Sequence, residues 1–308
     1  RRSRAPTPKR CLPVQARPKV TVGLLVYNEA AHVSEALDAI LGQTFTDYEI
    51  LVGDNCSTDG TTEIVAEYAS RDGRIQHLVH DRNIGALQNW NAIVRAAAGE
   101  YFVLAGGHDL WTPDYLDLLT RGLEGTPDAV LAFAKTQWID ERGMPLEKPT
   151  DAIDTSGMRH QQRFMAVMIT NQHYLYGLIR LSALRRTRLQ KEIIGSGEIL
   201  LQELAALGSF LLVEGPRWFR RENRKPETVL EKLERYERML FSSPRMRLRF
   251  RFFPLTQMFF CYLALPFQLP AVDWKQRLGM LALYPYLCLR FGLSLPVDLK
   301  WLVHRFLR

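Results

Sequence analysis

The sequence predicts an α/β protein with a Rossmann-like, mostly parallel sheet flanked by helices. Three observations lead to this prediction. Short apolar runs alternate with segments whose apolar residues recur at helical spacing. The runs have the length of buried strands, and a polar loop follows each of them. The composition is that of a globular protein, with 47% hydrophobic and 24% charged residues.

The first third of the chain contains the clearest elements. A helix is expected after the first strand, because Val33, Leu37 and Ile40 fall on one face at helical spacing. Further helical patterns at 61–68 and 89–98 separate the remaining strands, so the segment consists of βαβ units. The predicted strands are residues 20–26, 48–52, 75–79 and 101–105.

The pattern is less regular after residue 128, although elements can still be assigned. A helix over 198–207 ends at Gly208, and a charged helix is expected over 226–240. Residues 139–160 are interpreted as a polar loop or lid. Predicted strands are 129–134, 174–181, 210–213 and 218–219.

The positive charge is concentrated in one segment. The chain has a formal net charge of +7, and residues 215–251 alone carry +7. A basic band beside an apolar region favours anionic lipid or phosphate as a partner, and no nucleic-acid motif accompanies it. The four cysteines show no metal-ligand spacing, which favours free thiols in a reducing compartment.

Five motifs follow one another in the first part of the chain. They are YNE at 27–29, GDNCSTDGT at 53–61, RNIG at 82–85, AAGEY at 97–101 and GGHDLW at 106–111. In this order they resemble the family 2 inverting glycosyltransferases, which have the GT-A fold. The resemblance covers about residues 20–222 and implies a nucleotide-sugar donor with UDP, GDP or dTDP as its nucleotide.

The resemblance also implies the donor-binding residues. Asp54 would accept a hydrogen bond from the base, and Asn28 and Glu29 would lie near base and ribose. An ordinary cap of the following turn is the alternative for Asp54. Arg220 and Arg221 could meet the donor diphosphate or an acceptor phosphate, or form an exposed basic edge. The full set of expected donor-binding residues is Tyr27, Asn28, Glu29, Asp54, Asn55, Gly107 and Arg221.

The GGHDLW loop departs from the family pattern. The family supplies two carboxylates, one residue apart, to hold Mg²⁺ or Mn²⁺ against the diphosphate; here Gly106 and His108 occupy those positions, with Asp109 beside them. Asp109 and His108 could still bind the cation, and an imidazole ligand favours Mn²⁺. Alternatively, His108 contacts the diphosphate without a metal, or the loop belongs to an inactive relative.

Inversion at an anomeric carbon requires a general base to deprotonate the acceptor hydroxyl. The resemblance places this acid at the start of a late helix, where Glu198 is the acid at the boundary. Relatives commonly carry Asp there. The alternatives are Glu203, one turn further along, or an acid at position 198 favoured only by the helix dipole.

The chain is expected to have three parts: a flexible basic tail at 1–18, a glycosyltransferase domain at 19–222 and a helical region at 223–308. Residues 252–270 carry no charge but include three prolines. Amphipathic helices associated with the membrane interface are therefore expected, with packing on the catalytic domain, homo-oligomerisation or a true span as alternatives.

We therefore predict a bacterial inverting glycosyltransferase of polysaccharide biosynthesis. It is expected to be cytoplasmic and peripheral on the inner face of the plasma membrane, with a glycan or polyprenyl-linked acceptor. A sugar-phosphate nucleotidyltransferase would need a Gly-rich basic first loop, whereas residues 26–31 read VYNEAA. The third candidate is a non-catalytic protein that binds sugar nucleotides or acts as a scaffold.

Overall fold

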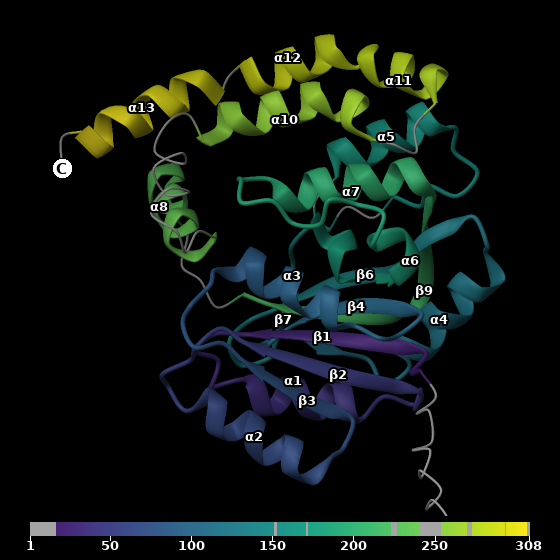
Figure 1. Ribbon diagram of the computed structural model, residues 1–308, viewed down its shortest axis with the longest axis vertical. Helices are drawn as coiled ribbons and strands as arrows, with labels where there is room; N and C mark the ends of the chain where they lie inside the picture. Colours follow the sequence, from purple (N-terminus) through teal and green to yellow (C-terminus); the bar gives the residue numbers. More distant parts are fainter. Residues whose placement is uncertain are drawn as a thin grey trace, which may run out of the picture.

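The computed structural model describes residues 17–150, 153–170, 172–222, 227–240, 254–269, 273–292 and 294–306. Within these residues a nine-stranded sheet has the order β3-β2-β1-β4-β8-β6-β9-β5, and β7 pairs with β6. One face of the sheet is covered by α1, α2 and α4, and the other by α3, α6 and α7 (Figure 1). The arrangement is a three-layer α/β fold.

The first half of the sheet is parallel, as the sequence predicts. Its neighbouring strands pair in parallel from β3 through β2 and β1 to β4. The predicted helices lie between them, and all four strands end at one edge. The bounds are β1 (Val20–Val26), β2 (Tyr48–Asp54), β3 (Ile75–Val79), β4 (Tyr101–Gly106), α1 (Val33–Leu41), α2 (Thr61–Arg71) and α3 (Ala86–Ala96).

The second half is mixed, so the prediction of a mostly parallel sheet is wrong for this half. The strand β8 runs antiparallel to both β4 and β6, while β9 is parallel to β6 and antiparallel to β5. The hairpin from β6 to β7 turns at 140–143, and so short a connection permits only antiparallel pairing. The bounds are β5 (Leu110–Trp111), β6 (Ala129–Ile139), β7 (Pro145–Leu146), β8 (Leu178–Arg180) and β9 (Ser209–Arg221).

Some elements of this half differ from the predicted ones. The two predicted closing strands belong to the single strand β9, and residues 172–176 form a 3₁₀ helix before β8. The predicted loop at 139–160 contains β7 and reaches the start of α5. The helices are α4 (Tyr115–Gly125), α5 (His160–Ile169), α6 (Leu181–Leu184), α7 (Ser196–Leu207) and α8 (Val229–Leu240).

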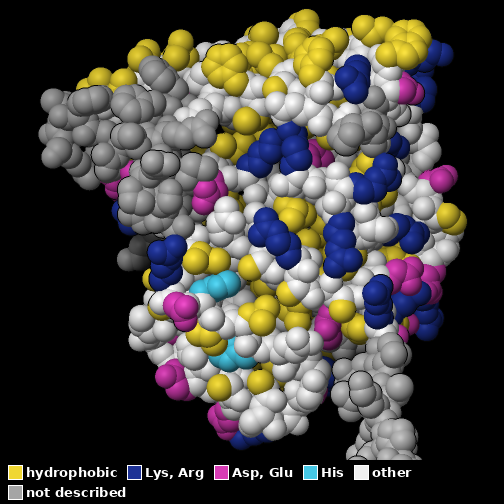
Figure 2. Space-filling view, in the orientation of Figure 1, with side chains coloured by type: hydrophobic (Ala, Val, Ile, Leu, Met, Phe, Trp, Pro, Cys, Tyr) yellow, Lys and Arg dark blue, Asp and Glu magenta, His cyan; other side chains and the backbone are white. Residues whose placement is uncertain are grey.

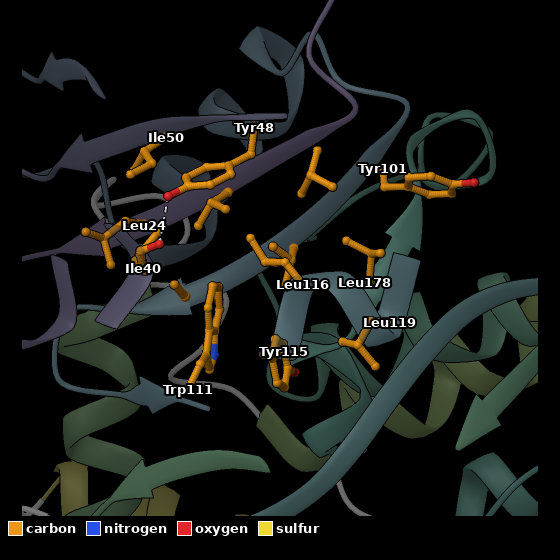
Figure 3. Close-up of a cluster of buried hydrophobic side chains, with 14 of the residues drawn as sticks. Leu24, Ile40, Tyr48, Ile50, Tyr101, Trp111, Tyr115, Leu116, Leu119 and Leu178 are labelled. Carbon is orange, nitrogen blue, oxygen red and sulfur yellow. Dashed lines mark hydrogen bonds between the residues drawn. The ribbon is translucent and has the colours of Figure 1, made fainter. Parts of the chain in front are cut away.

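Buried aromatic residues fix the strand that follows the GGHDLW loop. Trp111 stacks on Tyr115 with ring centroids 4.9 Å apart, and both lie in the core beneath the sheet (Figure 3). In the same cluster, the Tyr48 hydroxyl donates to the carbonyl of Ile40 over 2.9 Å. Because large buried aromatic side chains contribute strongly to packing, β5 is held firmly and the loop before it has a fixed end.

Four helices from residue 254 onward lie beside α5 and α7 on the side away from the sheet, with α10 between α7 and the other three (Figure 1). They are α10 (Pro254–Gln268), α11 (Trp274–Leu281), α12 (Tyr284–Gly292) and α13 (Ser294–Phe306). Met258, Tyr262 and Leu265 of α10 are buried in one cluster with residues of α5 and α7. Among the described residues, no helix has the length and apolarity that a membrane span requires.

Candidate functional site

Three adjoining cavities lie where the parallel strands end. The loop cavity, of about 550 Å³, is bordered by the loops after β1, β2 and β4. The basic cavity, of about 640 Å³, is bordered by β9 and α8, and the Glu198 cavity, of about 500 Å³, by the start of α7. Tyr176 and Met239 line all three. The cavities therefore form one cleft, which α8 borders throughout.

The loop cavity is lined by aliphatic side chains together with two tyrosines, three asparagines, His108 and the charged residues Glu29, Arg235 and Arg238. Tyr27 is 46% exposed and lines it together with Glu29 and Asn55. The Asn55 amide is held in place, because it donates to Asn83 Oδ1 over 2.9 Å and accepts from the backbone N–H of Ile84 over 2.8 Å. This side of the cleft therefore offers fixed amide groups beside an exposed aromatic ring.

Asp54 lies behind this cavity. Its side chain is fully buried, and its carboxylate accepts from the backbone N–H of Ser57 at 2.9 Å and from Thr62 Oγ1 at 2.5 Å. Burial raises the pKa of Asp54, but these hydrogen bonds and the charge of His77 outweigh it and lower the pKa. These contacts agree with the turn-capping alternative, whereas the next residue, Asn55, lines the cavity.

Asn28 connects the first two loops. Its backbone has a left-handed φ of 56°, and its Oδ1 accepts from the backbone N–H of Thr58 over 2.8 Å. Its own N–H donates to Ser57 Oγ over 3.0 Å. These contacts give Asn28 a positioning role, while its neighbours Tyr27 and Glu29 line the cavity.

The GGHDLW loop brings an imidazole and two carboxylates together. His108 Nδ1 lies 2.9 Å from Glu29 Oε1, and its Nε2 lies 3.9 Å from Asp109 Oδ1. A Cβ at Gly106 would lie only 2.8 Å from Asp109 Oδ2. Asp109 thus occupies space into which a side chain at position 106 would project. Gly107 is buried against Glu29, with its N–H donated to the carbonyl of Leu25.

Burial raises the pKa of the Asp109 carboxyl, and the positive charges of His108 and Arg220 act in the opposite direction. Among the described residues, no group of three or more His, Cys, Asp or Glu side chains could hold a metal ion. His108 and Asp109 nevertheless offer two neighbouring ligand atoms. Glu29 beside Nδ1 matches the carboxylate–histidine arrangement that orients metal-binding imidazoles. Of the described residues in this loop, His108 and Asp109 could thus supply at most two protein ligands to a cation.

Arg221 anchors the loop to the surrounding elements. Its Nη2 forms a 2.6 Å ion pair with Glu35 of α1, and its Nε donates to the carbonyl of His108 over 3.1 Å. Nη1 donates to the carbonyl of Glu141, and the backbone N–H donates to Asp109. The guanidinium is thus engaged by protein groups, which differs from the donor-binding role expected for it.

Arg220 instead lines both the basic cavity and the Glu198 cavity. Its guanidinium carbon lies 4.5 Å from the ring centroid of Trp138, and its Nη1 donates to His173 Nε2 over 2.6 Å. The sequence analysis missed His173 and Trp138, because neither belongs to a spaced motif. Only the pairing of β6 with β9 brings position 138 beside position 220.

Glu198 lies in the first turn of α7 and lines the cavity named after it. Gly195 precedes it with a left-handed φ of 72°, and a Cβ there would lie 3.0 Å from Glu198 Oε2. Glu203, the predicted alternative, is 1% exposed and pairs with Arg188 Nη2 over 2.6 Å. Glu203 is thus committed to an internal ion pair, and of these two acids Glu198 is the one that lines the cleft.

The geometry agrees with a family assignment. The family model described as glycosyl transferase family 2 matches residues 21–186, more than half of the chain. The chain belongs to this family.

Curated relatives show the same relationship. A glycosyltransferase of Methanocaldococcus jannaschii, MJ1057, is 31% identical over 134 residues, which are 43% of this chain and 46% of that protein. TuaG of Bacillus subtilis, named for glycosyl transfer in teichuronic acid biosynthesis, is 30% identical over 43% of this chain and 52% of its own length. The chain thus spans about half the length of these two relatives, and 35% of the Mycobacterium tuberculosis protein Rv1520.

Solved structures share the fold. S. aureus TarS 1-349, crystallised with UDP-GlcNAc, superposes with a TM-score of 0.63 at 15% identity, over 89% of this chain and 73% of that chain. The mannosyltransferase PcManGT of Pyrobaculum calidifontis, in complex with GDP-Man and Mn²⁺, superposes with a TM-score of 0.52 at 17% identity, over 94% and 84%. The predicted family and the GT-A fold are confirmed.

Proposed function

We propose that this family 2 protein is an inverting glycosyltransferase that transfers a sugar from a nucleotide sugar to a glycan or lipid-linked glycan. One observation carries the proposal: the loop cavity adjoins the Glu198 cavity, and Leu25, Leu104 and Tyr176 line both. A donor in the first cavity would therefore present its sugar to an acceptor in the second. The nucleotide-sugar complexes of TarS and PcManGT support this choice of donor.

The donor nucleotide would occupy the loop cavity. The exposed ring of Tyr27 offers a surface on which a base can stack. The Asn55 amide would bind the base edge, and Glu29 would face the ribose or diphosphate. Asp54 would have a positioning role, because its hydrogen bonds hold the turn that follows Asn55. This arrangement gives Asn55 the direct contact that the sequence assigns to Asp54.

The diphosphate would lie against the GGHDLW loop. His108 Nε2 and Asp109 would hold a divalent cation, with Glu29 orienting the imidazole. When bound, the cation would act as a Lewis acid toward the departing nucleoside diphosphate. The imidazole favours Mn²⁺ over Mg²⁺.

Glu198 would be the general base. In an inverting transfer the acceptor oxygen forms a bond to the anomeric carbon while the bond to the nucleoside diphosphate breaks. The acceptor hydroxyl must lose its proton during this step, and Glu198 would accept it. Its place at the start of α7, beside the cavity that adjoins the donor, supports this role.

The test begins with a thermal-shift screen of UDP-, GDP- and dTDP-sugars, followed by nucleotide release with candidate acceptors. Glu198→Gln should abolish transfer and leave donor binding within about twofold of wild type, because it removes the base without altering the loop cavity. Glu192→Gln, a change near the same helix but outside the cavities, is the matched control. Unchanged turnover in Glu198→Gln would refute the assignment of the base. Donor binding without transfer by the wild type would favour a non-catalytic binding protein.

We also propose peripheral attachment to the inner face of the plasma membrane. Hydrophobic side chains gather along the edge formed by α11 and α12, and basic side chains lie below them on the same face (Figure 2). Trp274 and Leu289 are 65% and 77% exposed, and Lys275 is exposed beside Trp274. Apolar anchors flanked by lysine are typical of interfacial helices on anionic lipid. A lipid-linked acceptor would be presented at such a surface.

A further inference from the structure

The basic cavity holds cations to which the proposed donor and base roles assign no task, and His108 and Asp109 of the GGHDLW loop also line it. It is bordered by β9, α8 and the segment after β7, and it lies next to both other cavities. Three carboxylates line it, those of Asp109, Glu222 and Glu227. The five Lys and Arg residues that line it are Lys148, Arg220, Arg221, Lys232 and Arg235.

Three of these cations have acidic partners. Lys148 pairs with Glu222 over 2.7 Å, and Arg235 pairs with Glu227 over 2.9 Å. Arg221 pairs with Glu35, as described above. In the part of the chain that the structure describes, Arg220 and Lys232 form no ion pair with a carboxylate. Two cations in a concave site attract a mobile anion, because the cavity walls focus the field.

Arg220 is also held in a defined orientation. Its guanidinium lies over Trp138 and donates to His173 Nε2, while His173 Nδ1 lies 3.0 Å from Thr136 Oγ1. Burial and the charge of Arg220 lower the pKa of His173 to about 3, so the imidazole is neutral and can accept at Nε2. A guanidinium fixed in this way loses little conformational entropy when it binds a ligand.

The position of this pair indicates which substrate it would contact. Arg220 and Lys232 line both the basic cavity and the Glu198 cavity, and neither lines the loop cavity. An anion bound between them would therefore lie on the side of the proposed base and outside the loop cavity proposed for the nucleoside. It would lie near the GGHDLW loop residues that also line the basic cavity.

We propose that Arg220 and Lys232 form a phosphate-binding site for the acceptor, so that the natural acceptor is a glycan or lipid that carries a phosphate group. The assignment to the acceptor rests on the proposed function, because it takes the Glu198 cavity as the acceptor cavity. A guanidinium fork matches two phosphate oxygens, and the lysine supplies a second positive charge. The acceptor hydroxyl would be placed relative to Glu198 through this phosphate.

The test measures inorganic phosphate binding through tryptophan fluorescence, because Trp138 and Trp218 lie beside Arg220. The titration is made on the full chain saturated with UDP or GDP, whichever nucleotide stabilises it. Phosphate should still bind in the presence of the nucleotide. Arg220→Gln should weaken phosphate binding at least tenfold and change the nucleotide Kd less than twofold. The phosphate affinity of Arg220→Lys should lie between that of wild type and that of Arg220→Gln.

Arg217→Gln is the matched control, because Arg217 lies on the same strand and hydrogen-bonds the carbonyls of Gly215 and Pro216. It should leave both affinities unchanged. Equal phosphate affinity in wild type and both Arg220 variants would overturn the site. Two results together would assign Arg220 to the donor diphosphate and overturn the acceptor role. Phosphate would no longer bind once nucleotide saturates the protein, and Arg220→Gln would bind nucleotide about tenfold more weakly than wild type.

The two proposals fail in different ways. If no nucleotide binds but Arg220-dependent phosphate binding persists, the proposed glycosyl transfer is refuted, while the phosphate site remains without its assignment to an acceptor. If nucleotide binds and is turned over while phosphate affinity is independent of Arg220, the phosphate site is refuted and the transferase proposal remains. A transfer assay with phosphorylated and dephosphorylated forms of one acceptor then measures the specificity directly, and equal kcat/KM values for the two would contradict the acceptor role.

Discussion

The two sides of the cleft are built in different ways. On the side of β1, β2 and β4, polar groups are bound to one another: Asp54 to Ser57 and Thr62, and Asn55 to Asn83. On the side of β9 and α8, Arg220 and Lys232 face the cavities without carboxylate partners among the described residues. This difference fits the two proposals, in which the first side is a preorganised surface for the nucleotide-sugar donor and the second a charged surface that selects the acceptor.

The largest expected effect concerns the loop on the first side. Removal of divalent cations with EDTA should lower transfer at least 100-fold, because His108 and Asp109 would then lack the cation that neutralises the leaving diphosphate. Mn²⁺ should restore activity at lower concentration than Mg²⁺, and His108→Ala should reduce this preference. The measurement is nucleotide release against metal concentration in both proteins. Transfer that is insensitive to EDTA would favour direct contact of His108 with the diphosphate.

The tight packing of the first side gives a second prediction. Gly53→Ala should lower the free energy of unfolding by roughly 1–3 kcal/mol, because the new Cβ would lie 2.6 Å from Ile93 Cδ1 beneath the loop cavity. Chemical denaturation measures the loss. Gly73→Ala is the control, since its Cβ would have no neighbour within 4 Å. Equal stability of the two variants would show that this side is not tightly packed.

The buried imidazole on the second side gives a pH prediction. In the folded protein the pKa of His173 is lowered from its ordinary value of 6.5 to about 3. At pH values below 6.5 the unfolded chain therefore binds this proton more readily than the folded protein does. Stability should therefore fall as pH drops from 6.5 toward 3, and the His173 contribution should be constant above 6.5. The slope is about 1.4 kcal/mol per pH unit for one proton. His173→Gln should remove this part of the slope, and an unchanged slope would contradict the assignment.

The smallest expected effect is on membrane binding. Trp274→Ser with Leu278→Ser should reduce sedimentation with phosphatidylglycerol vesicles several-fold, because both side chains are exposed on α11. Val79→Ser, a change of another exposed apolar side chain on β3, is the control and should bind like wild type. Wild-type binding that is equal for phosphatidylglycerol and phosphatidylcholine would argue against lysine anchoring. A wild-type dimer that binds no vesicles would assign this edge to a second copy.

The sequence predicts the first side of the cleft better than the second. Local periodicity and turn motifs determine β1 to β4, and strand ends bring Tyr27, Asn55 and His108 together because parallel strands share an edge. It did not predict that the side chains of Asp54 and Arg221 are buried and bound by protein groups, whereas their neighbours Asn55 and Arg220 line the cavities. That outcome depends on side-chain hydrogen bonds. The Arg220 environment depends on the long-range pairing of β6 with β9, which no local pattern encodes.

In the proposed function, donor binding and proton abstraction occur in neighbouring but separate cavities. Parallel measurements of nucleotide-sugar affinity and turnover in Tyr27→Ala and Glu198→Gln test it most directly. Loss of the base-stacking ring should weaken donor binding about tenfold, while turnover at saturating donor is largely retained. Glu198→Gln should keep the affinity and lose the turnover. If both variants lose affinity and turnover together, or if Glu198→Gln turns over normally, the division of the cleft into donor and base cavities is contradicted.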